Sequence, residues 1–207
     1  MLKQILKLSR IAVIAIGLFT IASCSPNAQN EEATDETVAE EAPAEEEAKE
    51  EAPKPKASPR MQAEGEAGGA TVKVDWGSPA VKGREIWGGL EDYGKVWRAG
   101  ANETTNIEFS TDVMINGTKV AAGKYGFFII PNDGADWVAI INTDWSREEH
   151  EIWGADKYTE EHDVVRVNVT PEWSEEVTES LEYKVEDGAI KFAWEKASFS
   201  IPVEAAN

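Results

Sequence analysis

The chain has 207 residues, of which 39 are acidic and 20 are basic, so its formal net charge at pH 7 is −19. Residues 25–69 carry 13 acidic and four basic side chains, and the chain from residue 70 onward is also strongly acidic. Nucleic acids and anionic lipid surfaces both attract basic patches. This charge therefore excludes nucleic acid as an expected partner and disfavours direct adsorption to anionic lipid.

The first 24 residues predict an export signal. A short basic stretch precedes the apolar run of residues 11–19, which is too short to span a bilayer, and the tetrad Ile-Ala-Ser-Cys follows at residues 21–24. This order resembles a bacterial lipoprotein signal, in which Cys24 receives a diacylglycerol and becomes the acylated N-terminus. The alternative is a chance cysteine at the end of an ordinary signal peptide.

Acylation of Cys24 fixes the expected location of the protein. The mature chain would be held to a membrane by lipid alone and would lie outside the cytoplasm, in the cell envelope. Ser25 follows the cysteine where an aspartate marks retained lipoproteins, which predicts delivery to the outer membrane. Cys24 is the only cysteine in the chain, so no intrachain disulfide is expected.

Residues 25–69 are predicted to form a disordered linker. They are rich in Glu, Ala and Pro, contain no aromatic residue and hold few branched aliphatic residues. Such a segment buries too little apolar surface to offset the entropy of ordering, and its like charges extend it. A transient Ala/Glu helix over residues 37–51 is the structural alternative.

Residues 70–207 are predicted to form one all-β domain that contains all eight tryptophans. Apolar and polar residues alternate along several runs, which indicates strands with one buried face. The expected strands cover 71–76, 105–110, 124–130, 137–142, 165–169, 181–186, 190–194 and 199–203.

Two dipeptides predict tight hairpins within this domain: Asn116-Gly117 and Asp187-Gly188 tolerate the positive φ of such turns. A short helix is possible over residues 146–153. The pattern favours an antiparallel β-sandwich of about eight or nine strands, with jelly-roll or Greek-key topology.

Several sequence blocks resemble the domain of unknown function 2911 family. They are residues 78–79 (SP), 81–90 (VKGREIWGGL), 93–103 (YGKVWRAGANE), 122–131 (AGKYGFFIIP), 153–154 (WG) and Trp194. The resemblance implies a mainly β fold and a secreted or lipid-anchored setting in the bacterial envelope. It implies no activity and no catalytic residues, and this chain has Ala99 where the family usually has threonine.

A glycine-rich segment from Gly83 to Gly100 holds the first candidate binding residues. Guanidinium groups beside aromatic faces suit a carboxylate, phosphate or sugar. The structural alternative is a loop over one edge of the sandwich, with its arginines paired to carboxylates and its tryptophans in the core. The residues concerned are Arg84, Trp87, Tyr93, Trp97 and Arg98.

Asn102 and Glu103 extend the candidate site, because an amide beside a carboxylate can position a ligand hydroxyl. The alternative is that residues 100–102 form an ordinary turn. The two histidines, His150 and His162, match no metal-ligand spacing, so no metal or cofactor is expected.

These observations favour a non-enzymatic, lipid-anchored envelope protein whose sandwich binds a ligand, either a carbohydrate or another envelope component. One alternative is a hydrolase or lyase that combines Arg84, Arg98, Asn102 and Glu103 with His150 or Asp163. A structural or assembly role in the envelope is the other.

Overall fold

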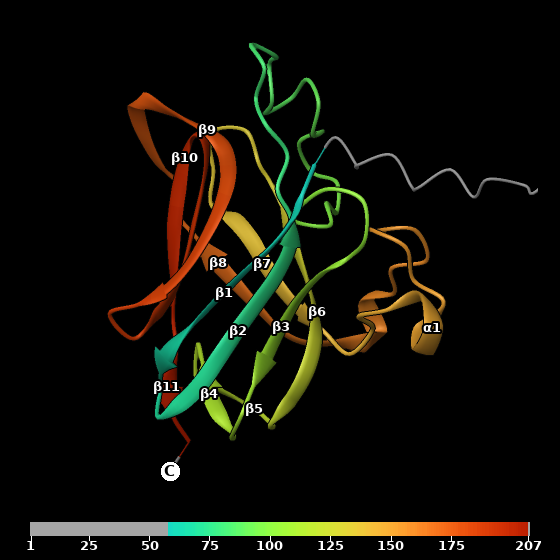
Figure 1. Cartoon of the computed structure of the whole chain (residues 1–207), viewed down its shortest axis with the longest axis vertical. Coiled ribbons are helices and arrows are strands. Elements are labelled where there is room, and N and C mark those ends of the chain that lie inside the picture. The colour runs from blue at the N-terminus through green and yellow to red at the C-terminus, as the bar shows by residue number, and fades with distance from the viewer. Residues whose placement is uncertain (1–57, 207) are drawn as a thin grey trace, which may run out of the picture. The chain divides into compact units, whose positions relative to one another are not determined.

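The computed structural model describes residues 58–206, and within that range the chain is mainly antiparallel β-structure (Figure 1). The expected signal peptide of residues 1–24, its Cys24 and residues 25–57 of the expected linker lie outside the described residues. The strands are β1 (Arg60–Ala67), β2 (Ala70–Gly77), β3 (Thr105–Phe109), β4 (Val113–Ile115), β5 (Thr118–Val120), β6 (Gly123–Ile130), β7 (Trp137–Asn142), β8 (Asp163–Val169), β9 (Glu172–Glu186), β10 (Ala189–Pro202) and β11 (Glu204–Ala205).

Six strands form the main sheet, in the order β1-β2-β3-β6-β7-β8, and each pairs antiparallel to its neighbours. The long hairpin of β9 and β10 lies on one side of this sheet, and the short helix α1 (Arg147–His150) lies on the other (Figure 1). A small sheet of order β11-β4-β5 closes one end. The predicted antiparallel, sandwich-like β fold is confirmed.

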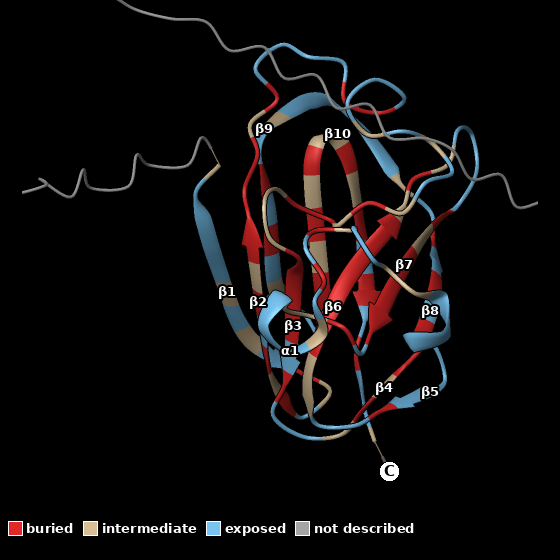
Figure 2. Ribbon diagram, turned by 90° about the vertical axis from the view of Figure 1, so that its right-hand side faces the viewer, coloured by how far each residue is buried: buried red, intermediate tan, exposed pale blue. Residues whose placement is uncertain are grey.

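Successive side chains in each strand point to opposite faces of the sheet. In β3, for example, Ile107 and Phe109 are buried, whereas Glu108 between them is exposed. The inward side chains form one continuous core with those of β9 and β10, which appears as the red interior of Figure 2. Because side chains in a strand point to opposite faces in turn, the other face is left free for polar residues.

Tryptophan rings fill the centre of this core. Trp87 packs 4.5 Å from Trp137 and 5.6 Å from Trp194, measured between ring centroids, and Trp97 stacks on Trp194 at 5.5 Å. All four residues are buried. Large aromatic rings in edge-to-face and offset contacts supply much of the apolar area that a core without disulfides needs.

β1 corrects the predicted domain boundary at residue 70. The expected linker included residues 60–67, but these residues pair along their whole length with β2, from Arg60↔Gly77 to Ala67↔Ala70. The glycines read as the end of a linker form the hairpin turn, with φ of 59° at Gly68 and 75° at Gly69. β1 is an edge strand whose polar residues alternate with small ones, and its inward residues Ala63, Gly65 and Ala67 are too small to give the apolar pattern that indicates a strand.

The two predicted hairpins are confirmed at β4–β5 and β9–β10, and Asn116 and Asp187 adopt positive φ at their turns. The possible helix at 146–153 is shorter than expected: α1 begins after its N-cap Ser146, and Glu151 ends it in the left-handed region. A 3-10 turn, Glu160–His162, follows. Among the described residues, no helix has the length and apolar character to span a membrane.

Segment 143–162, which includes α1, covers part of the outer face of the main sheet. Beneath it, Phe128, Ile140 and Ile152 form a second buried apolar cluster, separate from the main core. This packing holds the segment against one part of the outer face, and the rest of that face is not covered by the segment.

Candidate functional site

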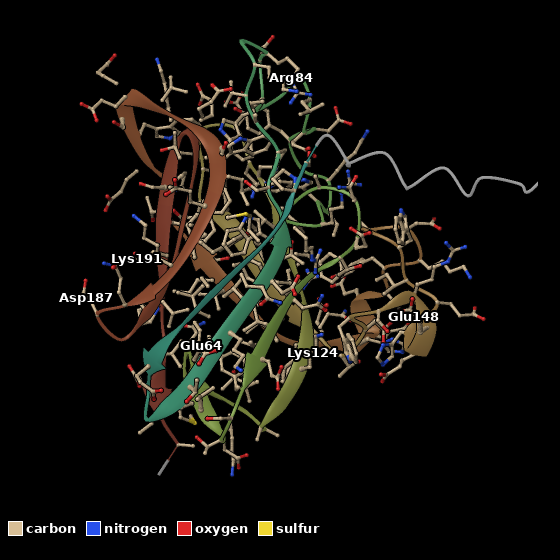
Figure 3. The ribbon with its side chains drawn as sticks, in the orientation of Figure 1. Glu64, Arg84, Lys124, Glu148, Asp187 and Lys191 are labelled. Atoms are coloured by element: carbon tan, nitrogen blue, oxygen red, sulfur yellow. The ribbon has the colours of Figure 1, made fainter. Side chains whose placement is uncertain are left out.

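A cavity of about 540 Å³ lies where segment 143–162 meets the open part of the outer face. The sheet supplies its floor and α1 with its flanking residues supplies one wall; Lys124 and Glu148 mark these two sides in Figure 3. The lining residues are Ser58, Pro59, Arg60, Asp75, Glu103, Thr104, Asn106, Lys124, Trp145, Ser146, Arg147, Glu148, Ile152 and Trp153.

The floor is built from the polar face of neighbouring strands. Asp75 on β2 is directly opposite Asn106 on β3 in the register. The Asp75 carboxylate accepts hydrogen bonds from the Arg60 Nε and from Gln62 Nε2, the latter at 2.7 Å. Arg60 also donates to the carbonyl oxygen of Thr104 at 3.2 Å. These bonds hold the floor rigid and pair the charge of Asp75.

Asn106 is the least satisfied polar group of this floor. Its side chain is buried, and its Nδ2 donates to the Thr104 carbonyl at 3.0 Å, which fixes the amide orientation. Its Oδ1 accepts no hydrogen bond from any residue within 58–206. A buried acceptor without a donor costs free energy, so Asn106 is a strained point of the cavity floor.

Two tryptophans with cations over their faces line the wall and the rim. Lys124 Nζ lies 4.2 Å from the centroid of the Trp145 ring, and the Arg147 guanidinium carbon lies 5.7 Å from that of Trp153. Trp153 is 42% exposed, so a ligand ring can reach it. Exposed indole beside hydrogen-bonding groups suits a ligand with both apolar and polar faces, such as a sugar ring.

A polar network fastens the two ends of segment 143–162 to the sheet. Asn142 donates to Asp163 at 2.7 Å and to the carbonyl of Thr159 at 3.0 Å, and its own Oδ1 accepts from the backbone of Asp144 at 2.8 Å. A side chain at Gly126 would overlap the carbonyl oxygen of Asp144, so glycine is required there. The tryptophan wall is therefore positioned by contacts made at the base of the segment.

His162 and Asp144 close this base with an ion pair. The Nδ1 of His162 lies 2.7 Å from Oδ2 of Asp144, which is largely buried. The hydrogen bond to Asp144 and the charge of that carboxylate raise the pKa of His162, and the nearby Glu161 and Asp163 act in the same direction. The positive form of His162 is thus favoured where the two ends of the segment meet.

Four of the residues predicted from sequence lie away from the cavity. Arg84 folds back on its own turn and donates to the carbonyls of Val81 at 3.0 Å and Ala80 at 2.5 Å. Trp87 and Trp97 are core residues, which was the structural alternative for them. Tyr93 is partly buried against the same core.

The other three predicted residues lie nearer the cavity. Glu103 lines it. Asn102 adopts a positive φ of 65° and donates to the carbonyl of Ser58 at 3.3 Å, so it serves the turn that was its structural alternative. Arg98 donates to the carbonyl of Gly100 at 3.1 Å, and a side chain at Gly154 would overlap it. Arg98 thus packs behind the wall.

Glu91 lies near Arg84 and Arg98, and its pKa shows what these two arginines do in the glycine-rich loop. Burial raises the pKa of Glu91 to about 7, while the charges of Arg98 and Arg84 act to lower it and that of Asp92 to raise it. The two arginines thus partly offset the cost of burying one carboxylate. This agrees with the structural alternative for the loop, in which its arginines serve carboxylates of the domain itself.

The geometry offers little to the predicted hydrolase or lyase arrangement. Arg84 is at the tip of the loop in Figure 3, far from the cavity beside Lys124, and its guanidinium is bonded to its own turn. His150 accepts from the backbone nitrogen of Trp145 at 3.3 Å and packs on that ring, so it supports the wall. Within residues 58–206, no three potential metal ligands converge.

The sequence prediction missed most of the cavity residues, including Asn106, Lys124, Trp145 and Arg147. The strands predicted at 105–110 and 124–130 contain Asn106 and Lys124, and the alternation of Ile107 and Phe109 with Asn106 and Glu108 was the available signal. It could not show which polar positions meet, because that depends on strand register and on a segment distant in the chain.

The chain matches the family described as Protein of unknown function (DUF2911) over residues 58–203, and it therefore belongs to that family. The matched range begins before β1, in agreement with the corrected domain boundary. No curated protein and no solved structure matches the chain.

The His162–Asp144 pair predicts a measurable titration. A pKa raised in the folded state means that the pair stabilises segment 143–162 fully below the ordinary pKa of about 6.5, and that this is lost as the pH rises through the folded value. In NMR titrations, His162 should titrate above 6.5 in the native chain, and Asp144→Asn should return it towards 6.5. The control Asp133→Asn, in an exposed turn, should leave it unchanged; an unaltered pKa in Asp144→Asn would contradict the assignment.

Glu91 predicts a pH-dependent stability difference. Because the folded pKa of about 7 exceeds the unfolded value near 4.5, folding favours the protonated acid, and ionisation destabilises the domain as the pH rises from 4.5 through 7. Glu91→Gln should therefore stabilise the protein by about 1–3 kcal/mol at pH 8 and by almost nothing at pH 4. Urea unfolding at both pH values measures this difference.

The matched control for that experiment is Glu85→Gln, an exposed residue of the same loop. It should shift the free energy of unfolding by less than about 0.5 kcal/mol at either pH. A Glu91→Gln variant whose effect is the same at pH 4 and pH 8 would show that this carboxylate is not desolvated.

Proposed function

We propose that this member of the DUF2911 family is a lipid-anchored envelope protein whose β-sandwich-like domain binds a ligand without transforming it. The cavity between the main sheet and segment 143–162 is the proposed binding site. The signal-like residues 1–24 and Cys24 support the envelope location, with lipid as the anchor and the outer membrane as destination. The domain would then work outside the cytoplasm.

The observation that carries the binding proposal is that Asn106, whose buried Oδ1 receives no hydrogen bond from any described residue, lies in the floor of the cavity. The amide is fixed by Thr104 and buried, and no described residue donates to its oxygen. Sites that bind small molecules place a few oriented polar groups in a largely apolar concave surface. Asn106 provides such a group, and Trp145 and Trp153 provide the surface.

A carbohydrate is the ligand class that these groups suit best. A sugar ring offers an apolar face for the indole of Trp153 and hydroxyl groups for the carboxylate of Glu103 and the polar residues of the floor around Asn106. Both basic and acidic residues line the cavity, so neutral hydroxyls find both donors and acceptors. The hydrophobic contact would supply affinity, and the polar floor would supply orientation.

A glycan array probed with the full chain tests the binding proposal, followed by calorimetry on the glycans that bind. Trp153→Ala should weaken binding about tenfold or more through loss of ring stacking. Asn106→Leu should weaken it about tenfold while leaving the unfolding free energy unchanged or slightly higher, because it removes an unpaired buried oxygen. The carbonyl oxygen of Thr104 still accepts a hydrogen bond in that variant, because Arg60 also donates to it.

Trp173→Ala is the matched control for the tryptophan variant. Trp173 is 55% exposed on β9 and lines no part of the cavity, so its loss should change glycan affinity less than twofold. An array without binding, or equal losses in Trp153→Ala and Trp173→Ala, would overturn the proposed site.

Metabolic labelling with an alkynyl palmitate tests the anchor separately. Cells expressing the native chain should yield a labelled, membrane-associated protein, and Cys24→Ala should yield an unlabelled one. Equal labelling of Cys24→Ala and of the native chain would contradict acylation at this cysteine.

A further inference from the structure

The cavity beside segment 143–162 continues into a second hollow over the same face of the sheet. This hollow has a volume of about 260 Å³ and shares Asp75, Asn106 and Lys124 with the first. It extends over β1 and β2 as far as Gln62 and Glu64. The two hollows form one surface, called here the cross-strand groove, that runs from the tryptophan wall to the edge strand.

Strand register arranges the polar residues of this groove in two rows. Gln62, Asp75 and Asn106 are successive partners across β1, β2 and β3. Beside them, a row of alternating charge crosses four strands, and Figure 3 shows Glu64 and Lys124 along a line that leads to Glu148 on α1. In order across the sheet this second row is Glu64, Lys73, Glu108 and Lys124.

We infer that the ligand of the cross-strand groove is a linear, neutral oligosaccharide that lies across the strands. This inference rests on the proposed function and names its substrate class. One end of the chain would stack on Trp153, and its other residues would cross Asn106 and Asp75 to Gln62 on β1.

The width of the sheet sets the length of the chain. Adjacent strands lie about 4.8 Å apart, so the three intervals from β6 to β1 span about 14 Å. A pyranose residue has about the length of one such interval, which gives room for about three or four sugar residues. Each residue would meet one new polar side chain as the ligand crosses one more strand.

The alternating row explains why the expected chain carries no charge. Glu64 pairs with Lys73 at 3.2 Å, and Glu108 and Lys124 complete the row, so its charges cancel. A polyanion would be repelled by the glutamates and by the acidic domain as a whole, whereas hydroxyl groups accept from lysine and donate to glutamate.

A peptide is a poorer occupant of this groove. An extended peptide binds a sheet by adding a strand at its edge, parallel to the existing strands and held by backbone hydrogen bonds. The cross-strand groove runs perpendicular to the strands, and its floor offers side chains in place of free backbone groups. A chain with a repeating ring and pendant hydroxyls meets this geometry better.

Calorimetry with two ligand series tests the inference on the full chain: β-1,4-linked N-acetylglucosamine oligomers and β-1,4-linked glucose oligomers, each of one to six residues. In at least one series, affinity should rise about threefold to tenfold with each added residue up to three or four, and then level off. Trp153→Ala should weaken binding at every length.

Gln62→Ala tests whether the ligand reaches the end of the groove that lies over β1. It should weaken the binding of the four-residue ligand about threefold to tenfold and leave that of the two-residue ligand unchanged. The matched control is Glu66→Ala, on the same strand and outside both hollows, which should change neither.

Equal affinity for one and four residues, a rise that continues to six residues, or no binding in either series would overturn this inference. These results are distinguishable from failure of the proposed function. If the glycan array finds a sugar that binds equally well as a monosaccharide and still depends on Asn106 and Trp153, the site stands and the linear ligand is wrong.

Discussion

The two-faced alternation of the six-stranded sheet is the constraint on which the rest of the structure depends. Ile107, Phe109 and Phe127 point inward to the tryptophan-filled core, so their neighbours Asn106 and Glu108 must point outward. With no cysteine in the domain to form a disulfide, apolar packing has to supply the stability, and most of the buried apolar residues lie on the inner face. The outer face can therefore carry polar groups that are costly to bury or only partly satisfied.

Segment 143–162 turns that outer face into a site. Phe128, Ile140 and Ile152 hold it by apolar packing, and the Asn142, Asp144 and His162 contacts fix its base. Because the segment covers only part of the sheet, it leaves a concave edge lined by tryptophan beside an open polar floor. The inner layer thus supplies most of the packing, and the outer layer supplies the cavity. Loop 83–100 belongs to the inner layer, because its residues Trp87 and Trp97 lie in the core and none of its residues lines the cavity.

Sequence reasoning recovered the features that depend on local pattern. Strands such as β3 and β8, and the hairpins at Asn116-Gly117 and Asp187-Gly188, follow from alternation and turn chemistry. β1 was not predicted because its inward residues, Ala63, Gly65 and Ala67, are small. Most of the cavity residues were not predicted, because Asp75, Asn106 and Lys124 are brought together only by the strand register across three strands. Of the predicted site residues, only Glu103 lines the cavity. Such long-range pairing leaves no mark in a single sequence.

The division between the two faces is tested most directly by a paired measurement on β3. Ile107→Ala and Glu108→Ala change adjacent residues on opposite faces of one strand, and urea unfolding gives the free energy for each. The account predicts a loss of about 2–5 kcal/mol for Ile107→Ala and a change within about 0.5 kcal/mol for Glu108→Ala. Comparable losses in both variants would show that the outer face is also structural, and would contradict the assignment of that face to ligand recognition.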